Sequence, residues 1–190
     1  TVATLLELGD REELARTARA LLASSDVEER RIGVQVATRL GYGQLIEVPT
    51  TPPPGATDEE LLAFLELAAA KGAAAPPEIK KAAYRLLGHP EGRVRAQAIA
   101  TQMAVGERSR NVYYRLVDLL HDPAKDVRAA AAAGLVMTGG EAARDELLPL
   151  ARDPSEDVRL ALWRAVQARP FPSAPLVLKR LCADLGDGFA

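Results

Sequence analysis

One arginine recurs at a nearly constant interval along this 190-residue chain. It stands five residues after a serine or a proline, in the pairs Ser25 and Arg30, Pro90 and Arg95, Pro123 and Arg128, and Pro154 and Arg159. The interval is 33 residues from Arg95 to Arg128 and 31 from Arg128 to Arg159, and the 65 residues from Arg30 to Arg95 equal two intervals. A period of this length is typical of a unit that buries its apolar face only by stacking on its neighbours. The spacing therefore predicts about five stacked units, one of them degenerate.

Each unit has the pattern of a helix, a proline turn and a second helix. In the clearest copy, apolar residues recur at helical spacing over 112–120, and His121-Asp122-Pro123 then interrupts the helix. We expect Asp122 to cap the second helix and Pro123 to begin it, because the first helical turn does not need a proline N–H. Extended to the whole chain, these signals predict helices at 2–8, 11–24, 27–40, 58–71, 77–88, 91–105, 110–121, 124–138, 141–152, 155–169 and 173–184.

The degenerate unit contains a proline-rich interruption. Residues 51–55 read Thr-Pro-Pro-Pro-Gly and cannot be helical, so the first helix of this unit is expected to shrink to about 44–48. Its second helix is expected to open at Thr57 and Asp58. We expect one domain over 1–190, interrupted at about 42–76. It is expected to be a fragment of a longer chain, because it opens at Thr1 inside a predicted helix.

The composition supports an all-helical fold and excludes several classes of protein. Alanine and leucine dominate the chain while aromatic residues make up 4%, which favours helices over strands. A net charge of -2 with 48% hydrophobic residues disfavours disorder, and no apolar run reaches the ~18 residues of a membrane span. The single cysteine excludes an internal disulfide and a site made of several cysteines. We expect a cytoplasmic protein without a membrane partner.

Two copies of one motif carry a resemblance to a known family. Asp-Pro-x-x-Asp-Val-Arg stands at residues 122–128 and 153–159, with a weaker copy at 89–95 and a glycine closing the second helix. The pattern resembles the HEAT-repeat superfamily, specifically the short HEAT-like repeats of the phycobilisome-lyase type. The resemblance implies an all-α, right-handed superhelix of about five helix pairs, with the second helices lining its concave face. Because the family spans scaffolds, adaptors and a few enzymes, function has to be argued from individual residues.

The most conspicuous polar residues are expected to be structural. The recurrent arginines, with Asp126 and Asp157, are expected to link neighbouring repeats through Asp–Arg and Arg–carbonyl hydrogen bonds. His89 and His121 follow predicted first helices and are expected to meet their last carbonyls. Cys182 is expected to be a small buried hydrophobic residue.

The chain carries no recognisable constellation for catalysis or metal binding. Two histidines without a third histidine or several cysteines do not make a typical zinc site, and the His-Glu pairs of the di-iron relatives are absent. No glycine-rich phosphate loop occurs. We therefore assign no catalytic, cofactor-binding or metal-binding residue.

Counting along the second helices predicts a binding face. The first, fifth and eighth residues after each recurrent arginine are expected to face the concave side, and only Arg31 and Arg164 among these twelve are basic. A protein that follows phosphates needs several lysines or arginines on one face, so nucleic acid is disfavoured as a partner. The central residues form an apolar trough flanked by Gln102, which suits a protein or peptide segment. The candidate partner-binding residues are Gln35, Ala96, Ala100, Met103, Ala129, Ala133, Val136, Leu160, Trp163, Arg164 and Gln167.

The function predicted from these patterns is a non-enzymatic protein–protein interaction module or scaffold. Trp163 either borders the trough or packs between the last two repeats. The alternatives are a structural spacer within a larger protein, a nucleic-acid-binding HEAT-like protein, and a lyase subunit that acts on a bilin. The identity of the partner and the oligomeric state stay open.

Overall fold

The computed structural model describes residues 11–24, 26–40, 49–52 and 54–186, and every regular element within these ranges is helical. The predicted all-α fold is therefore confirmed for this part of the chain. The chain divides into two compact units, residues 1–82 with 104–106 and residues 83–103 with 107–190. The boundary falls within α5 (Pro77–Leu86) and again at the end of α6 (Gly92–Ala104), and the single domain expected over 1–190 stays a prediction.

The first unit packs small side chains between successive helices. Its elements are α2 (Arg11–Leu22), α3 (Val27–Arg39), α4 (Asp58–Lys71), the 3-10 helix η2 (Gly72–Ala74) and the start of α5 (Pro77–Leu86). Ala18, Val36 and Ala37 form a buried cluster, against which Leu67 of α4 also packs.

The start of α4 is determined locally, by its cap. The hydroxyl of Thr57 accepts a hydrogen bond from the Glu60 N–H at 3.4 Å, and the Glu60 carboxylate accepts one from the Thr57 N–H at 2.8 Å. This reciprocal capping box satisfies two N–H groups that the helix itself leaves unpaired. The predicted start of this helix at Asp58 is confirmed.

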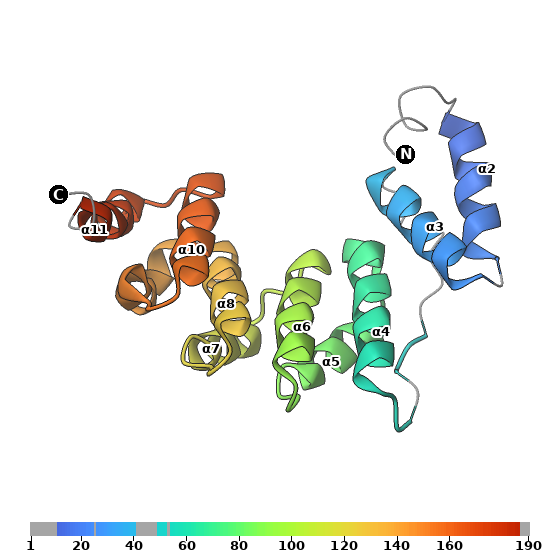
Figure 1. Ribbon diagram of the computed structural model, residues 1–190, viewed down its shortest axis with the longest axis horizontal. Helices are drawn as coiled ribbons and strands as arrows, with labels where there is room; N and C mark the ends of the chain where they lie inside the picture. The colour runs from blue at the N-terminus through green and yellow to red at the C-terminus, as the bar shows by residue number, and fades with distance from the viewer. Residues whose placement is uncertain (1–10, 25, 41–48, 53, 187–190) are drawn as a thin grey trace. The chain divides into compact units, whose positions relative to one another are not determined.

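The second unit repeats a helix pair and then begins a further helix. Its elements are the end of α5, then α6 (Gly92–Ala104), α7 (Arg110–Leu119), α8 (Lys125–Thr138), η3 (Gly140–Ala143), α9 (Arg144–Leu147), η4 (Leu148–Arg152), α10 (Glu156–Ala168) and α11 (Ala174–Gly186). Figure 1 shows α8 and α10, the second helices of consecutive pairs, beside one another, and they are in direct contact. This contact brings residues of different repeats onto one surface.

The core of the second unit contains one large apolar side chain from each successive helix. The fully buried residues include Ile99 of α6, Leu116 of α7, Leu135 of α8, Leu147 of α9 and Leu162 of α10. They come from the apolar faces that the helical periodicity predicts.

The predicted helix boundaries agree with the structure to within two residues, with one exception. The helix expected over 141–152 is broken into η3, α9 and η4. Gly140 has a φ of 52°, a left-handed conformation that favours glycine, and Pro149 has no N–H to donate to the preceding turn. The helices predicted at 2–8 and 44–48 lie outside the described residues.

Candidate functional site

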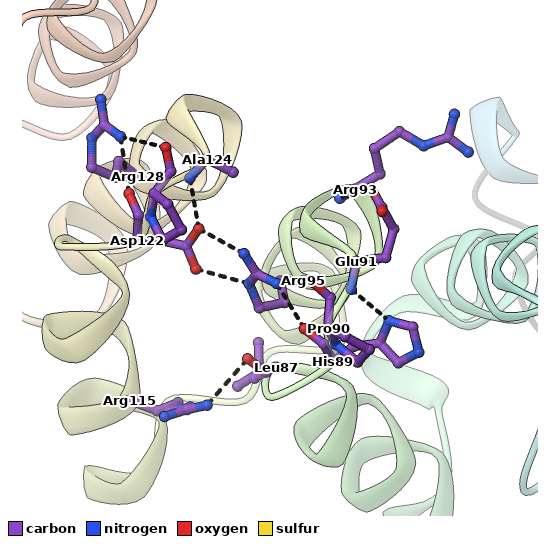
Figure 2. A network of polar contacts seen from close by, with 11 residues as sticks. Leu87, His89, Pro90, Glu91, Arg93, Arg95, Arg115, Asp122, Ala124 and Arg128 are labelled. Atoms are coloured by element: carbon purple, nitrogen blue, oxygen red, sulfur yellow. Dashed lines mark hydrogen bonds and ion pairs between the residues drawn. The ribbon is translucent and has the colours of Figure 1, made fainter.

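The recurrent arginines join each helix pair of the second unit to the next. Arg95 in α6 donates from Nε and Nη2 to the two carboxylate oxygens of Asp122, at 2.8 and 2.7 Å (Figure 2). Its Nη1 donates to the carbonyl oxygens of His89 and Pro90, each at 2.7 Å. The side chains of Arg95 and Asp122 are only 12% and 6% exposed, so this bidentate pair lies largely out of water.

The next arginine repeats this geometry one unit later. Arg128 in α8 donates from Nε and Nη2 to the carboxylate of Asp153 at 2.8 and 2.9 Å. Its Nη1 reaches the carbonyl oxygens of Asp122 and Pro123 at 2.9 and 3.2 Å. The predicted structural role is confirmed for Arg95 and Arg128 by these contacts, whereas the side chain of Arg30 lies outside the described part of the chain.

The carboxylates of this ladder are different from those that the sequence predicted. Asp122 and Asp153, in the turns, pair with the arginines, whereas Asp126 and Asp157 were expected to do so. Asp122 accepts the Ala124 N–H at 2.9 Å, and α8 begins only at Lys125, so the expectation that Asp122 caps the helix directly is wrong. The turn before each second helix faces the arginine of the preceding unit. This explains why the aspartates of the turns, and not those inside the helices, pair with the arginines.

The electrostatics of the pairs follow from these contacts. The hydrogen bond from Arg128 lowers the pKa of Asp153 against the opposing effect of burial, with help from the Ser155 N–H. Burial alone would raise the pKa of Asp122, but hydrogen bonds from Arg95 and the Ala124 N–H lower it overall. Both carboxylates are therefore held in the charged state that the arginines bind.

A second polar pair connects α8 to α10 near the surface. Lys125 Nζ donates to the Asp157 carboxylate at 2.6 Å, and both side chains are more than half exposed. This hydrogen bond raises the pKa of Lys125 and lowers that of Asp157. Each junction thus has a buried pair, and the junction between α8 and α10 adds an exposed one.

The third arginine of the ladder, Arg159, has a different environment. Its Nη1 donates to the carbonyl oxygen of Asp153 at 2.6 Å, as the ladder requires. Within the described part of the chain, no carboxylate pairs with its Nε or Nη2. Arg159 lines a hollow of about 280 Å³ together with Glu156, Leu160, Trp163 and Leu181. A charged group therefore lies next to an apolar cavity at the junction of α10 and α11.

Nine of the predicted partner-binding residues, most of them small or apolar, lie on the second helices of this unit and are accessible, and we call this set the second-helix face. Its members, all at least partly exposed, are Ala96, Ala100 and Met103 of α6, Ala129 and Ala133 of α8, and Leu160, Trp163, Arg164 and Gln167 of α10. Leu160 is 41% exposed, which is high for a large apolar residue.

Three of the predicted positions differ from this row. Val136 is only 3% exposed, because α8 is covered by both α7 and α10, so its expected place on the accessible face is wrong. Gln102, expected at the edge of the trough, is fully buried. Gln35 is exposed but belongs to α3 in the first unit, and its place on the same face stays a prediction.

The comparison with known families agrees with this repeated geometry. The family model described as HEAT repeats matches residues 113–188, which contain the second and third arginines of the ladder. Residues 113–188 therefore carry HEAT repeats, as the sequence motif predicted. The predicted α-helical solenoid is thereby confirmed, whereas the phycobilisome-lyase subtype stays a prediction. No curated protein and no solved structure matches the chain. HEAT repeats commonly act as scaffolds for protein interactions.

A groove lined by residues of α5, α7 and the turn after α5 went unrecognised in the sequence. It has a volume of about 480 Å³ and is lined by Tyr84, Arg85, Gly88, Asn111, Tyr114, Arg115 and Asp118. Tyr114 is 58% exposed, whereas Tyr113 donates from its hydroxyl to the Ala142 carbonyl oxygen at 3.3 Å. Burial, followed by the charge of Glu146, raises the pKa of Tyr113. The adjacent tyrosines Tyr113 and Tyr114 in α7 were the available signal in the sequence.

Two further expectations require correction. Cys182 is exposed rather than buried, because the buried positions of α11 include Val177 and Leu181, and Cys182 lies beside them on the helix. The Nδ1 atom of His89 accepts the Glu91 N–H at 3.2 Å at the start of α6, whereas it was expected to meet the carbonyls of α5 (Figure 2).

Metal-binding clusters and membrane-spanning helices are absent from the residues that the structure describes. Among them, no group of three or more histidine, cysteine, aspartate or glutamate side chains is placed to hold a metal ion. Every helix in the described ranges is too short or too polar to cross a membrane.

Proposed function

We propose that the chain is a non-enzymatic protein-interaction module that binds a segment of a partner protein on its second-helix face. The face runs over consecutive second helices, so one partner segment contacts several repeats at once. HEAT-repeat proteins commonly act as scaffolds, and this proposal names the surface that would do so in this chain.

The observation that carries the proposal is the accessible apolar row that ends at Trp163. Ala129 and Ala133 are small and partly exposed, so a partner helix can approach the backbone of α8 closely. At the end of the row, Leu160 and Trp163 border the hollow of about 280 Å³. Tryptophan beside a cavity is a frequent hot spot in protein interfaces, because a partner side chain can be fully desolvated there.

The charge of the face favours a protein over a nucleic acid. Arg164 is the only basic residue among its nine members. A surface that follows a phosphate backbone neutralises several charges, and one arginine does not supply them.

A substitution in the centre of the face tests the proposal. Helical peptides are selected from a display library on the wild-type chain, and their affinities are measured by calorimetry. Ala133→Glu should weaken the selected peptides at least about tenfold, because it places a charge in an apolar contact. Trp163→Ala should weaken the same peptides, because it removes the border of the hollow.

Ala63→Glu is the matched control, since Ala63 is an exposed alanine of α4 in the first unit. It should leave the affinities unchanged, and circular dichroism should show all three variants folded. Unchanged binding by folded Ala133→Glu would show that the partner does not use this face.

A further inference from the structure

The junction between α8 and α10 shows what the second helix of one repeat requires from the next repeat. Arg128 and Lys125 lie three residues apart in α8 and pair with Asp153 and Asp157, which lie four residues apart in the following turn and helix. One face of the helix thus recognises an acid in a turn and a second charge four residues later.

The corresponding positions in α10 are Arg159 and Glu156. Position 159 has the arginine of the ladder, and its Nη1 donates to the backbone carbonyl oxygen of Asp153. In the described ranges no carboxylate contacts its other nitrogens. Glu156 stands where α8 has Lys125, so the charge of the exposed position is reversed. Both residues line the hollow with Leu160, Trp163 and Leu181, which provide an apolar floor.

We propose that this hollow is a docking site for a protein segment with the chemistry of a repeat: a carboxylate in a turn, a basic residue four positions later, and an amphipathic helix. The carboxylate binds Arg159 as Asp153 binds Arg128. The basic residue pairs with Glu156, and the apolar side of the helix covers Leu160, Trp163 and Leu181. The inference rests on the proposed function and deepens it by naming the chemistry of a partner at one end of the second-helix face.

The reversed charge makes this partner distinguishable from the chain's own repeats. Between α8 and α10, the second charge on the incoming turn and helix is the acid Asp157, which suits Lys125. At Glu156 an acid in that position is repelled and a base is attracted. The site therefore selects for the second charge as well as for the carboxylate.

A peptide from the chain itself is a suitable probe. Residues 119–138 contain Asp122, Asp126 and the whole of α8, and they lack tryptophan, so Trp163, the single tryptophan of the protein, reports binding by fluorescence. Three synthetic peptides are titrated into the full chain: the native sequence, Asp126→Lys, and Asp126→Lys with Asp122→Asn.

The Asp126→Lys peptide should bind most tightly. The native peptide should bind about threefold more weakly, since an exposed charge pair contributes little. Loss of the carboxylate in the third peptide should weaken binding at least about tenfold, because Arg159 then lacks its partner. Equal affinity of all three peptides, or no binding of the Asp126→Lys peptide to the wild-type chain, would overturn the inference.

Variants of the protein complete the test. Arg159→Ala should weaken the Asp126→Lys peptide at least about tenfold. Glu156→Lys should reverse the order of the native and Asp126→Lys peptides. Arg108→Ala, at an exposed arginine before α7, is the control. It should change neither the affinity of the Asp126→Lys peptide nor the order of the two peptides. If Ala133→Glu weakens binding of the selected helical peptides while Arg159→Ala leaves the affinity of the Asp126→Lys peptide unchanged, the second-helix face is supported and this docking site is contradicted.

The chain's own acids are an alternative occupant of Arg159. Asp184 and Asp187 follow Arg159 by 25 and 28 residues, similar to the 25 residues from Arg128 to Asp153, and their side chains lie outside the described part of the chain. Asp184→Asn with Asp187→Asn should leave the affinity of the Asp126→Lys peptide unchanged. A rise of about tenfold or more would show that the chain covers this site itself, and the proposal of a separate partner would be wrong.

Discussion

At the scale of the residue, the ladder depends on carboxylates that are charged and yet nearly inaccessible to water. Asp153 lies in a turn, but its carboxylate pairs with Arg128 of the preceding unit, and its side chain is 6% exposed. Removal of one partner of such a pair leaves the other charge buried without compensation. The pair is therefore expected to matter more for stability than the exposed pair of Lys125 and Asp157.

Asp153→Ala should lower the free energy of unfolding of the second unit by about 3 kcal/mol at pH 7. Because the pKa of Asp153 is lowered below its ordinary value of 3.8 in the folded chain, its stabilising effect is complete above that value. It is lost as the pH falls through the folded pKa. The difference between the wild-type chain and the variant should therefore narrow below about pH 4.

Urea unfolding followed by Trp163 fluorescence at pH 7 and pH 3 measures this difference. Asp157→Ala is the control, since its pair with Lys125 is exposed, and it should have a much smaller effect at pH 7. If Asp153→Ala lowers the free energy of unfolding by the same amount at both pH values, the assigned role of the charged carboxylate is contradicted.

At the scale of the element, the end of α8 is determined by close packing against α7. A Cβ atom added to Gly139 would lie 2.7 Å from Cε2 of Tyr113 and 2.8 Å from Cβ of Ala143, closer than such contacts are found. The Tyr113 ring is held by the contact of its hydroxyl with the Ala142 carbonyl. A glycine is required here for space, because its φ of −106° is open to any residue.

Gly139→Ala should destabilise the second unit by about 2 kcal/mol through this overpacking. Urea unfolding of the single variants and of Gly139→Ala with Tyr113→Ala forms a double-mutant cycle. The substitution should cost less where the ring is absent. An equal cost in both backgrounds would show that Tyr113 does not set the limit.

At the scale of the whole molecule, each of the two compact units has a core of its own. Leu65 of α4 in the first unit and Leu162 of α10 in the second are both fully buried. In repeat proteins stability is the sum of local terms and nearest-neighbour interfaces, so a substitution acts mainly where it is made.

Leu162→Ala should lower the free energy of unfolding of the second unit by about 3 kcal/mol. The unfolding midpoint reported by Trp163 fluorescence should fall accordingly. Leu65→Ala should cause a loss of similar size in the first unit, visible in the circular dichroism transition, while the Trp163 transition stays near that of the wild type. Equal shifts of the Trp163 midpoint in both variants would show that the chain unfolds as one cooperative unit.

The helices and their repetition follow from local signals that can be read in the sequence. The period of Arg95, Arg128 and Arg159, the proline turns and the Thr57 cap are local signals, and local interactions place helix boundaries well. The exception, 141–152, is also local, since Gly140 directly precedes it and Pro149 stands within it.

The side chains that meet across repeats depend on how the helices pack, which the local signals do not contain. Asp122 and Asp126 are both acids near the start of α8, and choosing the partner of Arg95 requires the angle between turn and helix. Val136 looked equivalent to Met103 and Gln167, but it is buried because α7 and α10 cover α8. The Tyr84–Tyr114 groove and the hollow at Arg159 also arise from the packing of elements distant in sequence. Such contacts depend on how whole helices stack, and a helical period of 3.6 residues does not contain that information.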